Sequence, residues 1–312
     1  MRSNASPDVK KKGSFWKALK RDKALVLLAL PAVLYFIIFH YLPMGGVAIA
    51  FQDFKPGGGL FEGAFVGLQW FREFFSSAFF GRLLYNTFIL SLYMLVFSFP
   101  IPILFALMLT EVKEGMFKKT VQTVSYLPHF ISLVVVVGIM RNFLSPSDGI
   151  VNLVRSWMDA PPINFMEEPG WFRFLYVASG IWQEFGWNSI VYFAAISSID
   201  PQLYEAARID GCSRLGMMRH ITLPGIMPTA VTLLILQLGN VMNIGFEKII
   251  LMYSPNTYPV ADVISTFVYR YGIQNMQYSY AAAVGLFNSV INLVLLLMVN
   301  RFSRRHTGVG LF

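Results

Sequence analysis

Five long stretches of this chain contain no Asp, Glu, Lys or Arg, and this absence of charge limits the possible folds more than any other feature. A helix of about 20 apolar residues crosses the hydrocarbon core of a bilayer. Each stretch is long enough for such a crossing. They cover residues 24–52, 83–110, 120–140, 220–246 and 271–300.

A sixth apolar stretch covers residues 174–199 and is interrupted by one acid, Glu184. Backbone polar groups find no hydrogen-bond partners in lipid, so a spanning segment has to be helical. The sequence therefore predicts an all-α membrane protein with six transmembrane helices. Only 13% of the residues are charged, which excludes an ordinary soluble domain, because such domains contain about 25%.

The distribution of Lys and Arg predicts the orientation of these helices. If the N-terminus is cytoplasmic, segments 1–23, 111–119, 200–219 and 301–312 lie inside and carry 17 of the 25 basic residues. The positive-inside rule favours this arrangement, with both termini cytoplasmic. The chain then divides into a basic N-terminal segment, a six-span domain over 24–300 and a short tail. Because the basic N-terminal segment adjoins a span, we expect it to face membrane lipid, and we expect no nucleic-acid partner.

The residue types that perform catalysis or bind metals do not cluster in this sequence. Cys212 is the single cysteine, and the histidines His40, His129, His220 and His306 are scattered without metal-ligand spacing. The sequence also lacks the glycine-rich Walker A motif and the nucleophile elbow of hydrolases. We therefore expect no catalytic residue, no metal site and no cofactor on this chain. If ATP drives transport, another chain has to hydrolyse it.

A helix-turn-helix is predicted between the fourth and fifth apolar stretches. Asp200 followed by Pro201 is typical of an N-cap and the first residue of a helix. Gly211 suits the left-handed residue that ends a helix. A second short helix is expected to begin at Ser213 and to stop before Pro224.

This cytoplasmic segment contains Glu205-Ala-Ala-Arg-Ile-Asp-Gly211, then nine residues, then Ile221-Thr-Leu-Pro224. It resembles the EAA loop of permease subunits in binding-protein-dependent ABC importers, and every specified position matches. In that family the loop forms a coupling helix that sits in a cleft of the ATPase subunit. Small residues allow close approach, and the acid can make a charge-assisted contact with a basic group. The coupling residues implied here are Glu205, Ala206, Ala207, Asp210, Gly211, Ile221, Leu223 and Pro224.

The resemblance covers nearly the whole chain and implies the type I permease fold in a bacterial inner or cytoplasmic membrane. It also implies four kinds of partner: a second, similar permease, an ATPase dimer carrying ATP and Mg, an external solute-binding protein and the transported sugar. Some segments look like the carbohydrate-uptake group: Tyr126–Pro128, Gly149–Asn152, Ile199–Pro201 and Tyr278–Ala281. Others look like its complex-oligosaccharide subset, some of whose members carry pectin or alginate fragments: His40–Met44, Phe51–Phe54 and Asn300–Phe312.

Polar residues inside the spans are costly in lipid and suggest the transport pathway. Three amides in the fifth stretch recur at intervals of three, which would place them along one helix face. Amides bind sugar hydroxyls, an indole can stack on a sugar, and matching positions of maltose-type relatives lie in or beside their sugar site. Inter-helix packing is the alternative role for such residues. The candidates are Gln183, Glu184, Trp187, Asn188, Gln237, Asn240 and Asn243.

Glu184 has several possible roles on this evidence. It can bind a cationic or hydroxylated group, pair with a basic residue of the partner permease, or reach the outer headgroups, and its charge argues against a polyanionic substrate beside it. The rival class, an ion-coupled secondary sugar transporter, predicts paired acids and broken helices at the membrane midplane. The sequence shows one acid within a span and no repeat. It therefore favours an oligosaccharide permease driven by a separate ATPase.

The segments expected outside the membrane differ in character. Trp70, Phe71, Phe74 and Phe75 recur at helical spacing and predict a short amphipathic helix at the headgroup level. Segments 144–172 and about 248–270 are rich in turn residues. We expect them either to meet an external partner or to serve as solvated connectors.

Overall fold

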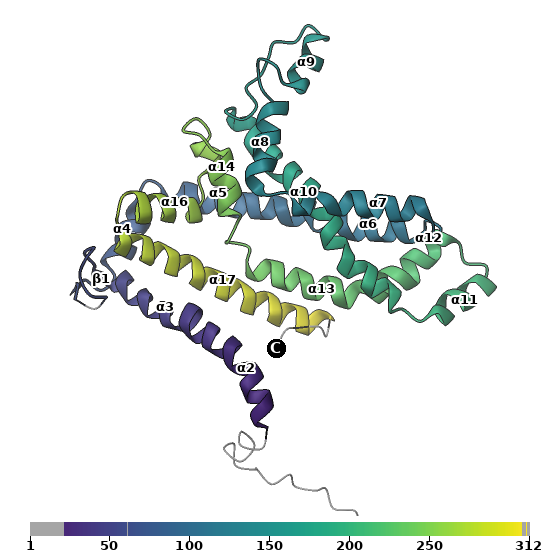
Figure 1. The fold of residues 1–312 in the computed structure, drawn as a ribbon, viewed down its shortest axis with the longest axis horizontal. Coiled ribbons are helices and arrows are strands. Elements are labelled where there is room, and N and C mark those ends of the chain that lie inside the picture. Colours follow the sequence, from purple (N-terminus) through teal and green to yellow (C-terminus); the bar gives the residue numbers. More distant parts are fainter. Residues whose placement is uncertain (1–21, 61, 308–309, 311–312) are drawn as a thin grey trace, which may run out of the picture.

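The computed structural model describes residues 22–60, 62–307 and 310. Most of the predicted basic segment 1–23 lies outside the described residues, as do four residues of the predicted tail 301–312. The described chain is mostly helical, and its longest helices run along the long axis of the molecule (Figure 1).

The long and short helices follow one another with brief connections. A two-stranded antiparallel sheet, β1 (Gln52–Asp53) with β2 (Ala64–Phe65), closes one end and pairs Gln52 with Phe65. The helices before the first sharp bend are α2 (Lys23–Phe36), α3 (Leu42–Met44), α4 (Gln69–Ser76), α5 (Phe80–Tyr93), α6 (Pro100–Thr110) and α7 (Met116–Tyr126). Those after it are α8 (Leu133–Phe143), α9 (Ile150–Ser156), α10 (Pro169–Ser197), α11 (Pro201–Ile209), α12 (Arg214–Met217), α13 (Leu223–Gly239), α14 (Phe246–Met252), α15 (Tyr258–Ala261), α16 (Ile264–Tyr269) and α17 (Tyr278–Thr307).

Four continuous helical segments are long and apolar enough to cross a membrane, which makes this a multi-pass membrane protein. They cover Lys23–Phe51, Phe80–Thr110, Arg214–Gly239 and Tyr278–Arg305. Each corresponds to one of the uncharged stretches of the sequence. Three of them contain a turn of π-helix (Ile37–Tyr41, Met94–Ser98 and Met218–Thr222), and the first segment ends in a 3₁₀-helix (Gly45–Phe51).

The predicted span over residues 120–140 is a bent pair of helices rather than one straight helix, so this span stays a prediction. The segments Met116–Phe130 and Leu133–Phe143 meet at an angle of 101°. Pro128 lacks the N–H that a continuing helix needs, and Ile131 adopts an extended conformation. Ser132 then caps the new helix by accepting a hydrogen bond from the Val135 N–H. The chain therefore turns sharply between α7 and α8.

Helix α10 corresponds to the predicted span over residues 174–199. With 29 residues it is long enough to cross a bilayer. Its Gln, Glu and Asn residues lower its mean hydropathy. It is therefore not among the helices that are both long enough and apolar enough to count as a span. Length and hydropathy together define four spans in the described chain, or five if the bent pair counts as one.

The fifth stretch differs from its prediction at both ends. The short helix that begins after Ser213 does not stop before Pro224 but continues through a π-helical turn into α13. A proline ring clashes with the carbonyl four residues back, and the wider turn avoids this clash because Leu223 N–H bonds to Met218 O, five residues back. At the other end the helix stops at Gly239, well before residue 246.

Helix α10 is the centre of the packing, because it contacts α6, α13 and α7. Its closest approach is to α7 at Gly186, where a Cβ atom would overlap the carbonyl oxygen of Ser125. A buried cluster between α6, α10 and α13 includes Ala106, Tyr192 and Ile226. The lack of a side chain at residue 186 therefore sets the spacing of α7 and α10.

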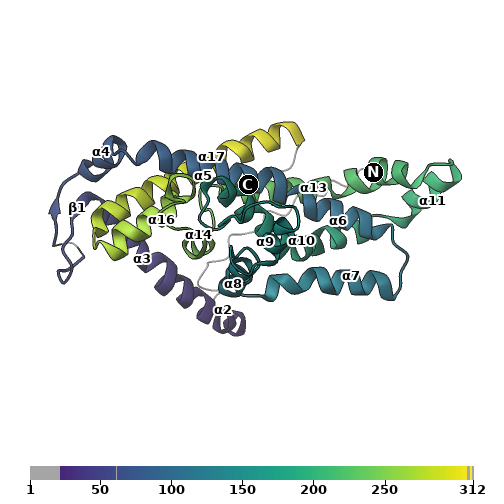
Figure 2. The same cartoon turned by 90° about the horizontal axis from the view of Figure 1, so that it is seen from above.

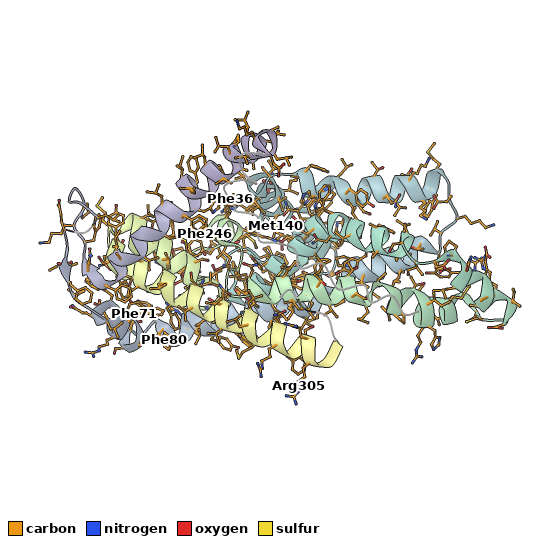
Figure 3. All side chains as sticks on the ribbon, turned by 90° about the horizontal axis from the view of Figure 1, so that it is seen from below. Phe36, Phe71, Phe80, Met140, Phe246 and Arg305 are labelled. Atoms are coloured by element: carbon orange, nitrogen blue, oxygen red, sulfur yellow. The ribbon has the colours of Figure 1, made fainter. Side chains whose placement is uncertain are left out.

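The amphipathic helix predicted around Trp70 is confirmed as α4, but its aromatic face packs on the protein itself. Phe74 is buried against Phe267 and Phe287. The indole Nε1 of Trp70 donates to the Gln52 carbonyl at 2.9 Å. Figure 3 shows Phe80 near α4, at the end of the molecule that carries the sheet.

The segment predicted as a turn-rich connector over residues 248–270 is a packed part of the fold. It contains α14, α15 and α16. The carboxylate of Asp262 is fully buried and lies 2.6 Å from the guanidinium of Arg270. Asn86 of α5 donates to the backbone carbonyl of Asp262 at 3.1 Å. The segment is therefore fixed to the long helices by buried polar contacts.

Helices α2 and α11 lie at the margins of the molecule. Helix α2 has no buried residue and diverges from the other long helices (Figures 1 and 2). Helix α11 projects at the end opposite to the sheet (Figure 1). These two helices present most of their surface to the surroundings of the described chain.

Replacing Gly186 with Ala should weaken the contact between α7 and α10. The added methyl group meets a backbone carbonyl that cannot move away without shifting α7, so we expect a loss of about 1–3 kcal/mol. The measurement is the apparent melting temperature of the purified protein in detergent. Gly138→Ala is the matched control, since a Cβ there meets no atom within 4 Å. An unchanged melting temperature for Gly186→Ala would contradict this account of the packing.

Candidate functional site

The segment that joins α10 to α13 has the local structure that its sequence predicts. The Asp200 carboxylate caps α11 by accepting a hydrogen bond from the Gln202 N–H at 2.9 Å, and Pro201 is the first helical residue. Gly211 ends the turn with a φ of +72°, in the left-handed region. The Cys212 N–H bonds back to the Ala207 carbonyl at 2.9 Å. The predicted cap, helix and glycine turn are confirmed.

The second half of the segment connects rigidly to the long fifth helix. Ser213 caps α12 by accepting a hydrogen bond from the Gly216 N–H at 3.1 Å. The hydroxyl groups of Tyr204 and Thr222 lie 3.0 Å apart and join α11 to the start of α13. Because α12 continues into α13 without a break, the segment forms the end of a helix that reaches Gly239.

Most of the predicted coupling residues lie on the surface of this segment. Glu205, Ala206, Asp210, Gly211 and Pro224 are exposed, whereas Ala207, Ile221 and Leu223 are half-buried. Two apolar side chains that sequence reasoning missed are also exposed: Ile209 at 87% and Leu215 at 72%. A set of exposed apolar side chains beside charged ones is typical of a protein–protein contact. Their apolar character within a polar loop was the signal that could have identified them.

A cavity of about 320 Å³ lies between α6, α10 and α13. Its wall on α10 includes Gly180, Glu184 and Asn188, which are four residues apart and share one face. Gln237 of α13 lines the opposite side. The structure thus brings together three of the predicted pathway residues, Glu184, Asn188 and Gln237, around one space that a sugar ring can enter.

Glu184 pairs within its own chain. Its Oε2 atom lies 2.9 Å from Nδ1 of His129, a residue of the 3₁₀ turn between α7 and α8. The His129 ring also stacks on Trp187, with the ring planes 2° from parallel and the centroids 4.4 Å apart. One face of the indole is therefore covered by His129. Sequence reasoning treated His129 as isolated, and only the bend at Pro128 brings it to α10.

Gln183 points away from the cavity. Its side chain is buried, and its Nε2 atom donates to the Ile131 carbonyl at 2.9 Å. Ile131 is the extended residue at the bend between α7 and α8, where a carbonyl has no partner within a helix. Gln183 therefore has the inter-helix packing role that was the alternative to a pathway role, because its amide satisfies the carbonyl that the bend leaves free.

The three amides of the fifth stretch do not lie along one helix face, so that prediction was wrong. Asn240 is the C-cap of α13, and Asn243 follows it in a non-helical turn. Asn240 is exposed, and Asn243 accepts a hydrogen bond from Asn288 at 2.8 Å. Asn243 and Asn288 line a second cavity of about 560 Å³, beside α16 and α17. The helix ends early, and the last two amides are therefore separated from Gln237.

A buried lysine that sequence reasoning missed lies close to this site. Lys248 of α14 is 6% exposed, and its Nζ atom donates to the Tyr176 carbonyl of α10 at 2.9 Å. In the sequence, Lys248 directly follows Glu247 at the edge of an uncharged stretch, and this position gave no signal that Lys248 is buried. In the described residues, no three His, Cys, Asp or Glu side chains lie close enough to hold a metal ion.

The described chain is a helical membrane bundle with an exposed 200–224 segment and a cavity between its helices. The family of binding-protein-dependent transport system inner membrane components matches residues 75–308, and the chain belongs to this family. Members of the family are permease components of ABC transporters, which carry no catalytic site of their own.

Several individual proteins resemble the chain over almost its whole length. The protein LplB of Bacillus subtilis is 43% identical over 302 residues, which cover 96% of this chain and 95% of LplB. The polygalacturonan/rhamnogalacturonan transport system permease protein YteP of the same organism is 42% identical over 294 residues, or 94% and 92% of the two chains.

A solved structure shares the fold in detail. A chain in the crystal structure of a bacterial alginate ABC transporter, in complex with its periplasmic protein bound to an alginate pentasaccharide, superimposes with a TM-score of 0.88. It is 46% identical, and the match covers 96% of this chain and all of that one.

Replacing Gly211 with Ala should loosen the coupling segment without unfolding the bundle. An L-residue at a φ of +72° is strained by about 1 kcal/mol, which corresponds to roughly fivefold more frequent local opening. Hydrogen exchange of the α11 amides, followed by mass spectrometry, measures this opening. Gly211→Asn is the matched control, because asparagine tolerates the left-handed region and should exchange more slowly than the alanine variant. Equal exchange in both variants would contradict the assigned turn.

Proposed function

We propose that this chain forms half of the translocation pathway of an ATP-driven oligosaccharide importer in a bacterial inner or cytoplasmic membrane. In this proposal it crosses the membrane six times, with both termini in the cytoplasm. A second permease of similar fold supplies the other half of the pathway. A separate ATPase dimer, which holds ATP and Mg, binds the 200–224 segment, and an external solute-binding protein delivers the sugar.

One observation carries the proposal. The helix from Arg214 to Gly239 begins in the exposed coupling segment and reaches the cavity, where it places Gln237. With 26 residues and a rise of about 1.5 Å per residue, it extends over roughly 39 Å. A displacement of α11 by the ATPase can therefore reach the cavity wall through one rigid element. This gives a physical route from ATP hydrolysis to the opening and closing of the pathway.

The substrate class is proposed from the relatives and from the cavity together. YteP is named for polygalacturonan and rhamnogalacturonan transport, and the similar solved structure belongs to an alginate transporter. Both kinds of polymer contain uronic acids. The cavity here carries a carboxylate, two amides and the hydroxyl of Ser98, groups that hydrogen-bond to sugar hydroxyls. We therefore assign oligosaccharides of uronic acids as the cargo.

The ion-coupled carrier is the rival class, and one observation speaks for it. The bent α7–α8 pair is a broken helix of the kind such carriers use. The acid beside the bend, however, is paired with His129 rather than with a second acid. Uptake into proteoliposomes distinguishes the classes: our proposal requires internal ATP, whereas a carrier requires only an ion gradient.

Replacing Glu205 with Lys should uncouple transport. The exposed carboxylate is proposed to contact a basic group of the ATPase, and reversing its charge turns this attraction into repulsion. We expect oligosaccharide uptake and sugar-stimulated ATPase activity to fall together, while the melting temperature of the chain is unchanged. Glu111→Lys is the matched control, because Glu111 is an exposed acid on another predicted cytoplasmic segment. Normal uptake by the Glu205 variant would remove the coupling role.

Replacing Gln237 with Leu should impair sugar transport while leaving the ATPase able to bind. The change keeps the side-chain size but removes the amide from the cavity, so we expect uptake to fall about tenfold for one lost pair of hydrogen bonds. Asn240→Leu is the matched control, because Asn240 is exposed and does not line this cavity. If both variants reduce uptake equally, the pathway follows the amide stripe of the sequence rather than the cavity.

A further inference from the structure

Lys248 is a buried cation. Neither the exposed 200–224 segment nor the packing of the long helices gives a reason for its charge. Its Nζ atom donates to one carbonyl, that of Tyr176, and lies 4.8 Å from the centroid of the Tyr176 ring. An ammonium group has three N–H donors. Burying such a group is costly unless charges or hydrogen bonds compensate. One carbonyl and one ring face leave part of its hydrogen-bonding capacity open.

The charges around Lys248 leave room for one more carboxylate. Among the described residues, no carboxylate lies within ion-pairing distance of the Lys248 ammonium group. The Glu184 carboxylate of the cavity wall already pairs with His129 at 2.9 Å. The sequence-based argument against a polyanionic substrate considered Glu184 without its contact to His129 and without the buried Lys248.

The ammonium group lies directly behind the cavity wall. Gly180 and Met94 both line the cavity. A Cβ atom on Gly180 would lie 3.2 Å from Nζ of Lys248 and 3.3 Å from the terminal carbon of Met94. No side chain of residue 180 therefore separates the ammonium from the cavity, and the Met94 side chain is flexible enough to move aside.

We propose that Lys248 is a specificity-determining residue, which binds the carboxylate of a uronic acid unit in the cavity between α6, α10 and α13. This inference rests on the proposed function. A carboxylate that enters a membrane-embedded pathway needs a paired charge, whereas a neutral sugar does not. Lys248 supplies this charge, and Gly180 gives access to it.

The test compares two sugars that differ in charge. The complete transporter is reconstituted with ATP and its binding protein, and uptake of a galacturonate trisaccharide is measured beside that of its carboxyl-reduced, neutral form. Each variant is expressed relative to the parent protein for each sugar. Because the same binding protein delivers the sugar to every variant, its own preference cancels in this ratio.

For Lys248→Met we expect uptake of the acidic sugar to fall about tenfold or more, because a charge-assisted contact is lost, while uptake of the neutral sugar stays near the parent level. Lys248→Arg keeps the charge and should retain most of the acidic uptake. Lys119→Met is the matched control, since Lys119 is an exposed lysine on α7. Equal loss for both sugars in Lys248→Met would mean that Lys248 only ties α14 to α10, and the proposal would be overturned.

A double variant separates substrate binding from internal neutralisation. If Lys248 serves only to offset Glu184, the combination of Lys248→Met with Glu184→Gln should restore acidic uptake, which would overturn the proposal. If Lys248 binds the sugar carboxylate, the ratio of acidic to neutral uptake stays as low in the double variant as in Lys248→Met, whatever Glu184→Gln does to both sugars together. Should Lys248→Met fail to assemble, Gly180→Ala tests the same point, because its methyl group screens the ammonium from the cavity. Equal uptake of both sugars by Gly180→Ala would then overturn the proposal.

The proposed function and this inference can fail separately. A parent transporter that imports neither sugar with ATP contradicts the proposed function. A parent that imports both sugars, with Lys248→Met showing the same ratio as the parent, contradicts only the role of Lys248.

Discussion

The close contact of α7 with α10 at Gly186 determines most of the candidate site. Because no side chain stands between Gly186 and the Ser125 carbonyl, α7 lies directly on α10. The chain then bends after Pro128, and the bend leaves His129 against Glu184 and Trp187. Gln183 satisfies the carbonyl that the bend exposes. A bulkier residue at 186 would move the whole turn away from the cavity.

The second organising element is the helix that links the two functional regions. Pro224 would normally end or kink a helix, and the π-helical turn over Met218–Thr222 lets the helix continue past it. The same element therefore carries the exposed coupling segment at one end and Gln237 at the other. A hinge at Pro224 would have absorbed a movement of α11, whereas a continuous helix can transmit it.

Two acidic side chains of the fold lie in different surroundings. Asp262 is paired with Arg270 in the packed segment 248–270, and Glu184 pairs with His129 beside the cavity. The Asp262 carboxylate is buried and also accepts a hydrogen bond from Thr266 at 2.8 Å, so this pair serves the fold. Glu184 lines a cavity, and the buried ammonium of Lys248 lies behind the cavity wall at Gly180. This difference in surroundings separates a structural ion pair from a candidate binding site.

The sequence alone determined the membrane class, the EAA segment and its local structure, because these depend on hydropathy and on neighbouring residues. Asp200, Pro201 and Gly211 act within one turn of chain, so their roles followed from their order. The polar residues predicted for the pathway are only partly brought together by the fold. Glu184, Asn188 and Gln237 meet around one cavity, but Asn240 and Asn243 fall beyond the end of α13. Only the tertiary structure decided where α13 stops, that His129 lies beside Glu184 and that Lys248 lies beside Tyr176. The last two contacts join residues 55 or more positions apart, and no local pattern encodes them.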